Sequence, residues 1–172
     1  MKILLLGYMG SGKSAVGQQL AEVLTIPFYD LDQEIEKELK KTVSEIFQKK
    51  GELFFRKTEN NVLVQLLASK ENYVLALGGG TPCYGNVMKL IQEREDVKSI
   101  YLHTSLEELT KRLYPERKKR PLIAHLETEE ALNDFIRKHI FERNFYYNQA
   151  DSKVQADATV DKIVSEIVLQ LF

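Results

Sequence analysis

The chain has 172 residues, of which 44% are hydrophobic and 28% charged; this composition predicts one folded domain and excludes a disordered chain. The 24 basic and 25 acidic side chains leave a formal net charge of −1, so we expect no nucleic-acid and no membrane partner, because both usually require a basic excess. The single cysteine, Cys83, cannot form an internal disulfide, and no apolar run approaches the ~18 to 20 residues of a membrane span. These features predict a cytoplasmic protein.

Taken in chain order, short apolar runs predict the strands of a buried sheet. The runs are residues 3–6, 28–30, 73–77, 97–102 and a weaker one near 154–160. Continuous apolar runs of this length are typical of parallel strands that are covered on both faces.

Helical spacing occupies the intervals between these runs. Thr42–Glu45 and Ser105–Glu108 both have the T/S-x-x-E pattern of a capping box, which starts a helix. Further helices are predicted from Lys13 towards Pro27, over 52–69, over 128–148 and over 161–172. This alternation predicts an α/β fold in three layers, with a parallel five-stranded sheet between two layers of helices, in a single domain over residues 1–172.

Residues 7–14, Gly-Tyr-Met-Gly-Ser-Gly-Lys-Ser, match the phosphate-loop pattern G-x-x-x-x-G-K-[ST] in full. The glycines let backbone N–H groups surround phosphate oxygens, and the helix that follows points its positive end at the same anion. Lys13 brings a positive charge to the outer phosphates, and the Ser14 hydroxyl is suited to ligate Mg²⁺. The loop follows a buried strand and opens a helix, which favours a nucleotide phosphate site over a simple glycine-rich turn.

Two aspartates, Asp30 and Asp32, follow the second predicted strand. Ligands of doubly wound sheets bind outside the carboxyl ends of the strands, and side chains at alternate positions can face the same crevice. We therefore favour a functional role for both, over the alternative that one of them only caps the next helix.

Two arginines lie where an apolar helical stripe ends. Arg56 shares a face with Glu52 and Glu59, and either clamps an anionic substrate group bidentately or only pairs with Glu52 four residues earlier. Arg143 shares a face with Leu132, Ile136 and His139, and either converges on the same cleft or is a solvated arginine with its stem on the core. Spacing alone leaves both choices open.

Residues 114–126, the lid segment, interrupt the helical pattern with two prolines and a basic cluster, Arg117–Arg120. Beside a nucleotide site, such a segment is expected to be a mobile lid that supplies positive charge to the triphosphate, over the alternative of solvated surface. The three histidines and Cys83 have no metal-ligand spacing.

Together these motifs resemble the shikimate kinase family, small phosphate-loop kinases similar in fold to nucleoside monophosphate kinases. The resemblance runs from Leu4 to about Gln155. Beyond the phosphate loop it rests on Asp30-Leu31-Asp32, Gly51-Glu52, Phe55-Arg56, Glu59, Gly78-Gly79-Gly80, Arg120-Pro121-Leu122 and Arg143.

The resemblance implies a monomeric enzyme that transfers the γ-phosphoryl group of ATP to the 3-hydroxyl of shikimate, giving shikimate 3-phosphate in aromatic amino acid (chorismate) biosynthesis. It implies Mg²⁺ on Ser14 and, through water, on Asp30, and Arg112 against the adenine. The implied nucleotide contacts are Gly10, Ser11, Gly12, Lys13, Ser14, Ala15, Arg112, Arg120 and Gln155.

The acceptor site follows from the same resemblance. Lys13, Asp32 and Arg120 are the implied catalytic residues. At its ordinary pKa near 3.9, Asp32 would be a weak base, so we expect it mainly to orient the attacking hydroxyl. The implied shikimate contacts are Asp32, Phe47, Phe55, Arg56, Gly78, Gly79, Gly80 and Arg143.

Two other interpretations remain open. One is another small-molecule kinase of the same fold, acting on gluconate or a nucleoside monophosphate. The other is a non-enzymatic nucleotide-binding switch that signals through a partner. Stimulation of ATP consumption by shikimate separates a kinase from a switch, whose turnover would not depend on an acceptor.

Overall fold

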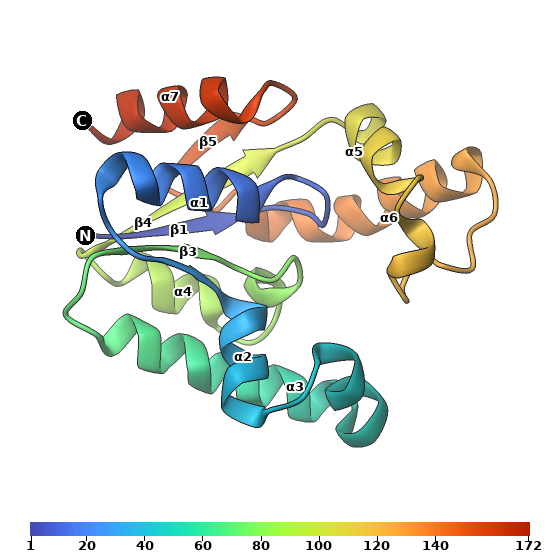
Figure 1. The fold of residues 1–172 in the computed structure, drawn as a ribbon, viewed down its shortest axis with the longest axis horizontal. Coiled ribbons are helices and arrows are strands. Elements are labelled where there is room, and N and C mark those ends of the chain that lie inside the picture. The colour runs from blue at the N-terminus through green and yellow to red at the C-terminus, as the bar shows by residue number, and fades with distance from the viewer.

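The computed structural model describes residues 1–172 and contains a single sheet of five parallel strands in the order β2-β3-β1-β4-β5 (Figure 1). All four strands predicted with clear apolar runs are present, and the fifth lies earlier in the chain than expected. The strands are β1 (Lys2–Leu6), β2 (Phe28–Asp30), β3 (Tyr73–Ala76), β4 (Val97–His103) and β5 (Ser152–Gln155).

Helices cover both faces of the sheet, which confirms the predicted three-layer α/β architecture. Helices α1 (Lys13–Leu24) and α7 (Val160–Leu171) lie above it in Figure 1, and α3 (Val43–Ala68) and α4 (Val87–Gln92) lie below it. Helix α6 (Glu129–Tyr147) packs on the same side as α3, while α2 (Leu31–Leu39) contacts α3 and α5 (Leu106–Leu113) contacts α6.

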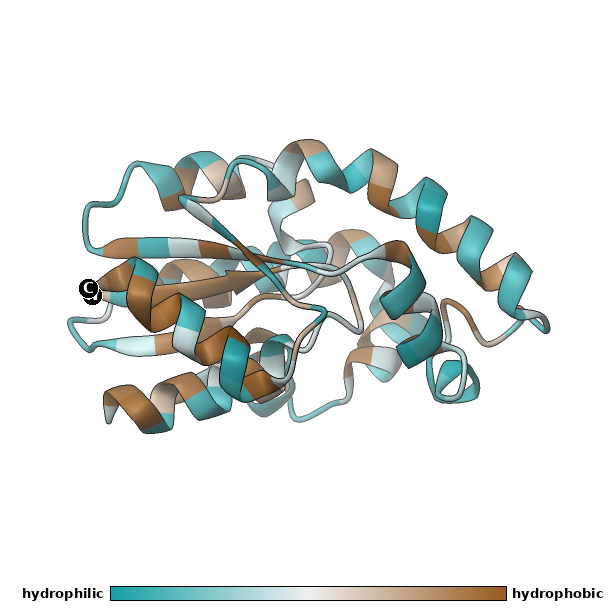
Figure 2. Ribbon diagram, turned by 90° about the horizontal axis from the view of Figure 1, so that it is seen from above, coloured by the Kyte–Doolittle hydropathy of each residue, from teal (hydrophilic) through white to brown (hydrophobic).

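Strand β1 shows why its sequence is a continuous apolar run. Leu4 and Leu6 belong to a core that they share with α3 and α6, whereas Ile3 and Leu5 belong to a second core beneath α1 and α7. All four side chains are fully buried. Figure 2 shows hydrophobic colour along the central strands, and hydrophobic and hydrophilic colours alternating along the surrounding helices.

The helix starting at Thr42 and the one predicted over 52–69 form one element, α3. Thr42 makes the predicted capping box with Glu45, and the helix continues to Ala68 with a break at Gly51, whose φ of 80° is left-handed. The second predicted box is only half made: Ser105 Oγ accepts from the backbone N of Glu108, but the Glu108 carboxylate turns to Arg112, whose Nε lies 2.8 Å away. None of the helices is both long and apolar enough to cross a membrane.

Candidate functional site

The phosphate loop connects β1 to α1 and has the conformation that its glycines permit. Gly10 and Gly12 have φ angles of 80° and 89°, in the left-handed region that disfavours a side chain. The ammonium of Lys13 folds back over the loop, where Nζ donates to the carbonyl oxygens of Gly7 and Tyr8 at 2.9 and 3.0 Å. The loop thus carries a positive charge at its centre, where phosphate oxygens would lie.

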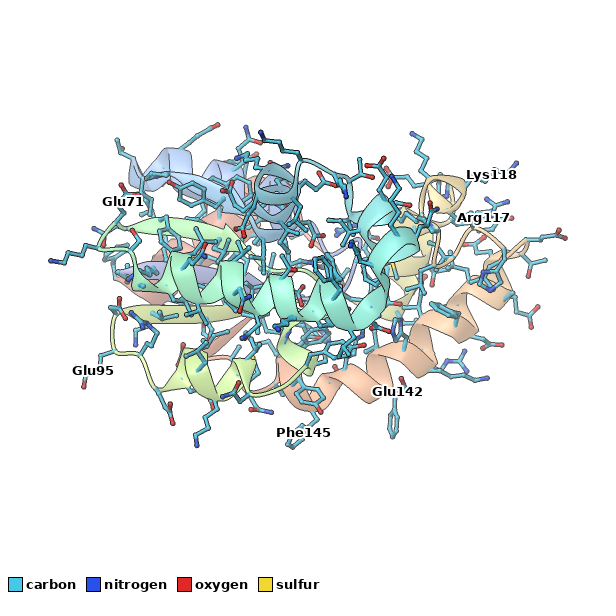
Figure 3. All side chains as sticks on the ribbon, turned by 90° about the horizontal axis from the view of Figure 1, so that it is seen from below. Glu71, Glu95, Arg117, Lys118, Glu142 and Phe145 are labelled. Carbon is cyan, nitrogen blue, oxygen red and sulfur yellow. The ribbon has the colours of Figure 1, made fainter.

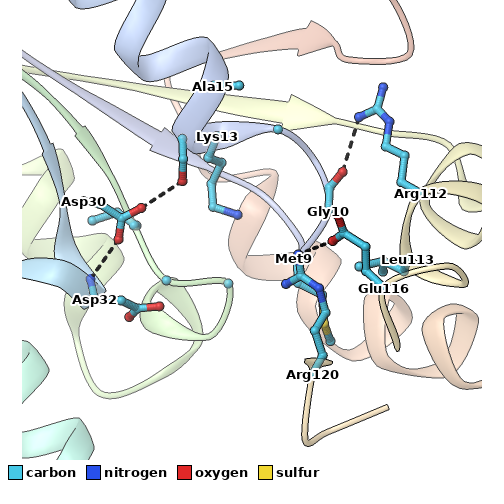
Figure 4. A pocket seen from close by; sticks show the side chains of 15 residues that line it. Met9, Gly10, Lys13, Ala15, Asp30, Asp32, Arg112, Leu113, Glu116 and Arg120 are labelled. Carbon is cyan, nitrogen blue, oxygen red and sulfur yellow. Dashed lines mark hydrogen bonds and ion pairs between the residues drawn. The ribbon is translucent and has the colours of Figure 1, made fainter. Parts of the chain in front are cut away.

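A cavity of about 540 Å³ opens beside this loop (Figure 4). It is bounded by the phosphate loop, the end of β2, the segment after β3, helix α5 and the lid segment. Met9, Leu77, Leu113 and Glu116 line it without having been predicted. The predicted site residues that line it are Gly10, Gly12, Lys13, Ser14, Ala15, Asp30, Asp32, Gly78, Gly79, Arg112 and Arg120.

Ser14 and Asp30 lie together at one wall of the cavity. The Ser14 hydroxyl donates to Asp30 Oδ2 at 2.8 Å, and Asp30 Oδ1 accepts from the backbone N of Asp32 at 3.1 Å (Figure 4). Asp30 therefore caps α2 and also faces the cavity, a position that is compatible with the predicted role. A hydroxyl and a carboxylate are hard oxygen ligands of the kind Mg²⁺ prefers.

These oxygens are too few to enclose a metal ion. No group of three or more histidine, cysteine or acidic side chains is placed to hold one. Mg²⁺ commonly binds one or two protein oxygens and takes its other ligands from water and substrate phosphates. The Ser14 and Asp30 pair fits such a metal when it arrives with a nucleotide.

Asp32 lies in the first turn of α2 and faces the same cavity. Burial raises its pKa to about 6, the negative charges of Asp30 and Glu59 act in the same direction, and Lys13 and Arg56 oppose them. The expectation of a weak base with a pKa near 3.9 is therefore wrong. A carboxylate with a pKa of about 6 is a substantially better proton acceptor near neutral pH.

The glycine triplet after β3 lies against the other predicted acceptor residues. A Cβ on Gly80 would lie 2.6 Å from Arg56 Nη2, and one on Gly79 would lie 3.4 Å from Arg143 Nη1. A Cβ on Gly78 would lie 3.3 Å from Asp32 Oδ1. The three charged residues thus meet along the triplet, and the same Gly79 position is 3.4 Å from the backbone N of Met9 in the phosphate loop.

Arg56 is held mainly by a residue for which no role was assigned. Its Nη1 donates to Glu59 Oε2 at 2.9 Å, and Glu59, only 2% exposed, also accepts from the Thr81 hydroxyl at 2.6 Å. The pair with Glu52 exists but is long, at 3.7 Å. Arg56 Nε is buried and has no hydrogen-bond partner. The sequence signals for Glu59 are its place among the residues of the family resemblance and its spacing of three residues from Arg56, on a stripe that otherwise becomes apolar.

Arg143 and Tyr147 approach the triplet from α6. The Arg143 guanidinium lies 5.7 Å from the centre of the Tyr8 ring, and the Tyr147 hydroxyl donates to the carbonyl oxygen of Gly79 at 2.5 Å. Tyr8 in turn is hydrogen-bonded to His139 at 2.8 Å. Arg143 is therefore half-buried against Gly79 and Tyr8 without lining the cavity itself, and His139 contacts Tyr8 beside it.

Seven predicted contacts lie outside the cavity lining: Arg56, Gly80 and Arg143, which are described above, and Phe47, Phe55, Ser11 and Gln155. The Phe47 and Phe55 rings pack together with centroids 4.5 Å apart, and Phe55 is buried beside the Arg56 guanidinium. Ser11 is buried in the phosphate loop. Gln155 contacts His103 at 2.9 Å and donates to Asp157 at 2.8 Å.

Three side chains of the basic cluster in the lid segment, Arg117, Lys118 and Arg120, lie in different surroundings. Arg117 donates to the backbone carbonyls of Tyr114 and Leu126, which fixes the segment internally. Lys118 points outward at the periphery of the molecule (Figure 3). Arg120 lines the cavity, where its Nη2 pairs with Glu116 at 3.2 Å. Glu116 is the only acidic residue of the lid segment and lies four residues before Arg120, a spacing that could have indicated this pair.

Comparison with known proteins identifies close relatives over the whole chain. A family model described as shikimate kinase matches residues 9–172. A shikimate kinase from Flavobacterium johnsoniae is 49% identical over 168 residues, which cover 97% of this chain and 96% of that protein. A shikimate kinase from Aquifex aeolicus is 37% identical over 172 residues, covering 99% and 96%.

Solved structures agree with the sequence relatives. A crystal structure of shikimate kinase from Bacteroides thetaiotaomicron matches with a TM-score of 0.91 at 32% identity, covering 99% of this chain and 98% of that one. Shikimate kinase from Acinetobacter baumannii in complex with shikimate matches at 0.83 and 33%, covering 99% and 91%. A gluconokinase from Sinorhizobium meliloti, at 0.56 and 19%, shares the fold alone.

Proposed function

The chain belongs to the shikimate kinase family and is an ATP-dependent phosphotransferase that phosphorylates shikimate, and on this premise we propose how its own side chains carry out the transfer. The acceptor atom in this proposal is the 3-hydroxyl, and the product is shikimate 3-phosphate. The supporting observation is the meeting of Asp32, Arg56 and Arg143 along the glycine triplet, beside the phosphate loop.

The phosphate loop holds the ATP phosphates. Backbone N–H groups of residues 10–15 surround them, and the Lys13 ammonium exchanges its two carbonyl contacts for phosphate oxygens. Arg120 reaches them from the lid segment once it leaves Glu116. Arg112, which lines the same cavity, lies against the base of the nucleotide.

Ser14 and, through water, Asp30 would hold a Mg²⁺ ion that enters with ATP, in keeping with their oxygen donors. Such an ion supplies charge neutralisation at the phosphate oxygens. The chain's own contribution is to place a hydroxyl and a carboxylate on one side of the phosphate loop, since α2 begins where β2 ends.

Arg56 and Arg143 bind the shikimate carboxylate. Because Glu59 occupies Nη1 of Arg56, the edge formed by Nε and Nη2 remains for the two oxygens of a carboxylate. Gly80 lets this edge approach the backbone, and the packed rings of Phe47 and Phe55 form an apolar wall. The pocket thus fixes a small, singly charged ring.

Asp32 positions the attacking hydroxyl and takes its proton. As the bond from the shikimate oxygen to the γ-phosphorus forms, the bond from that phosphorus to the β,γ-bridging oxygen breaks and ADP leaves. The proton passes to the Asp32 carboxylate, whose raised pKa favours this acceptance. Lys13 and Arg120 stabilise the negative charge on the transferring group and on the leaving oxygen.

The proposal also covers the domain organisation, the oligomeric state and the cellular location of the protein. The chain acts as one domain over 1–172, with residues 114–126 closing over the nucleotide as a lid. It works as a monomer, which light scattering would test. The unpaired Cys83 and the need for ATP favour the cytoplasm.

A coupled assay of ADP release with a panel of acceptors tests the function. We expect strong stimulation by shikimate and none by gluconate or by nucleoside monophosphates, which need a differently shaped site. ATP consumption that does not depend on any acceptor would contradict a kinase and support the nucleotide-binding switch.

A further inference from the structure

Tyr84 lies beside the carboxylate-binding arginine and belongs to none of the motifs that identify the family. It follows the 3₁₀ turn Thr81–Cys83 that the glycine triplet opens, and it is partly exposed. Its ring covers one face of the Arg56 guanidinium, with Arg56 Cζ 4.0 Å from the ring centre. Its hydroxyl donates to Glu52 Oε1 at 2.6 Å. Tyr84 thus touches both partners of the Glu52–Arg56 pair.

The same oxygen of Glu52 stops short of the arginine. Glu52 Oε1 lies 3.7 Å from Arg56 Nε, which is beyond hydrogen-bond distance. Arg56 Nε is buried and unpartnered, although an exposed carboxylate stands four residues away on the same helix. A free glutamate at this spacing would ordinarily close on an unpaired guanidinium N–H.

We infer that Tyr84 is a positioning residue that holds Glu52 away from Arg56, and so keeps the Nε–H group of the guanidinium unpaired for the carboxylate of the substrate. The inference rests on the proposed function of Arg56. Tyr84 makes two contacts with different effects. Its ring lies on the face of the Arg56 guanidinium and leaves the N–H edges free, while its hydroxyl donates to Glu52, which would otherwise pair with one of those edges.

Glu59 and Glu52 therefore have opposite relations to Arg56. Glu59 is buried, accepts from Nη1 and fixes the orientation of the guanidinium. Glu52 has a side chain that is 55% exposed and is directed to Tyr84 instead. If Glu52 were released, it would compete with the incoming carboxylate for the same N–H group.

Tyr84→Phe is the matched variant, because it keeps the ring on Arg56 and removes only the hydroxyl. We expect the KM for shikimate to rise about three- to tenfold, the scale of a competing charge-assisted hydrogen bond. The kcat and the KM for ATP should stay within about twofold of the parent values, since only ground-state binding of the acceptor changes.

Adding Glu52→Gln to Tyr84→Phe should restore the KM for shikimate, because the neutral amide is a poor competitor for the guanidinium. Tyr84→Leu with Glu52→Gln separates out the stacking contribution of the ring. A KM for shikimate that is unchanged in Tyr84→Phe, or that Glu52→Gln fails to restore, would overturn the inference.

A crystal structure of Tyr84→Phe without shikimate supplies a readout that does not depend on activity. We expect a Glu52 carboxylate oxygen within hydrogen-bond distance of Arg56 Nε, and a Glu52 that stays away from Nε overturns the inference. If the parent protein fails to phosphorylate shikimate, the proposed function fails, and this structure still decides whether Tyr84 restrains Glu52.

Discussion

Lys13 and Asp32 line the same cavity, and burial shifts their pKa values towards each other. Burial lowers the pKa of Lys13 to about 8, opposed by the charges of Asp32 and Asp30. Burial likewise raises the pKa of Asp32 to about 6, with Lys13 among the charges that oppose it. The charged forms of both residues therefore coexist only in a narrow interval around neutral pH.

This relationship predicts a bell-shaped pH dependence of kcat/KM for ATP, which reports the free enzyme. Activity should fall below a pH of about 6, where Asp32 becomes protonated, and above about 8, where Lys13 loses its proton. At saturating ATP the phosphates raise the pKa of Lys13, so the alkaline limb of kcat should move upward. Steady-state rates across this range check the prediction, and an acidic limb near pH 4 would contradict the shift of Asp32.

Asp32→Asn should lose activity and gain stability. Turnover should fall at least about 100-fold, because the proton acceptor is gone, while the Kd for ATP changes little. The unfolding free energy at pH 8 should rise by about 1 to 3 kcal/mol, because ionising Asp32 in the folded protein is disfavoured by roughly two pKa units.

The stability gain expected for Asp32→Asn depends on pH, because it comes from the cost of ionising Asp32 in the folded protein. The carboxyl has a higher pKa in the folded than in the unfolded state, so its cost is absent below pH 3.8 and complete above about 6. Urea unfolding at pH 8 and at low pH measures both limits. A parent-like turnover would remove Asp32 from the mechanism, and an equal gain at both pH values would show that its charge is not the cause.

Arg56→Lys should weaken shikimate binding by about 2 to 5 kcal/mol, because an ammonium cannot present the two parallel N–H groups that match a carboxylate. Calorimetry with shikimate gives the Kd directly. Arg137→Lys is the matched control, since Arg137 is an exposed α6 residue paired with Asp134 at 3.1 Å. An unchanged Kd in Arg56→Lys would contradict the assignment of this side chain to the carboxylate.

Glu116→Gln should lower the KM for ATP by up to about fivefold, in the range expected for an exposed ion pair. The substitution frees Arg120 from its 3.2 Å contact and removes a negative charge from the lining of the phosphate cavity. Glu93→Gln, which removes a charge from an exposed pair with Lys89, serves as control. A higher KM for ATP in Glu116→Gln would mean that the pair positions Arg120 for the nucleotide.

The sequence predicts best those elements that have a continuous apolar run or a complete capping motif. Residues 73–77 form an apolar run because β3 is covered on both faces, and Thr42 with Glu45 makes the capping box that its spacing predicts. Two helices were absent from the expectations. In α2 only Leu31 and Ile35 are buried, so the apolar stripe is thin, and α4 has just six residues.

Strand β5 was expected near residues 154–160 but spans Ser152–Gln155, because its apolar pattern is also weak. It lies at the edge of the sheet and only Val154 among its four residues is buried, so there is no apolar run to mark it. In the site, the sequence motifs contain most of the residues that the structure places around the cavity. The pairs of Arg56 with Glu59 and of Arg120 with Glu116 have the ordinary helical spacings of three and four residues. The contact of Glu59 with Thr81 joins α3 to the turn after β3, and no local spacing predicts it.

The order of the strands also determines how far apart the loops after β1 and β3 lie. β1 and β3 are hydrogen-bonded neighbours, so the two loops that follow them emerge about 4.8 Å apart in the sheet direction. In the proposed function, one of these loops receives the donor and the other faces the acceptor, so the separation between the two substrates is set by two adjacent strands of the sheet. In the same proposal, residues 114–126 belong to neither strand, so changes in their sequence would leave this separation unaltered.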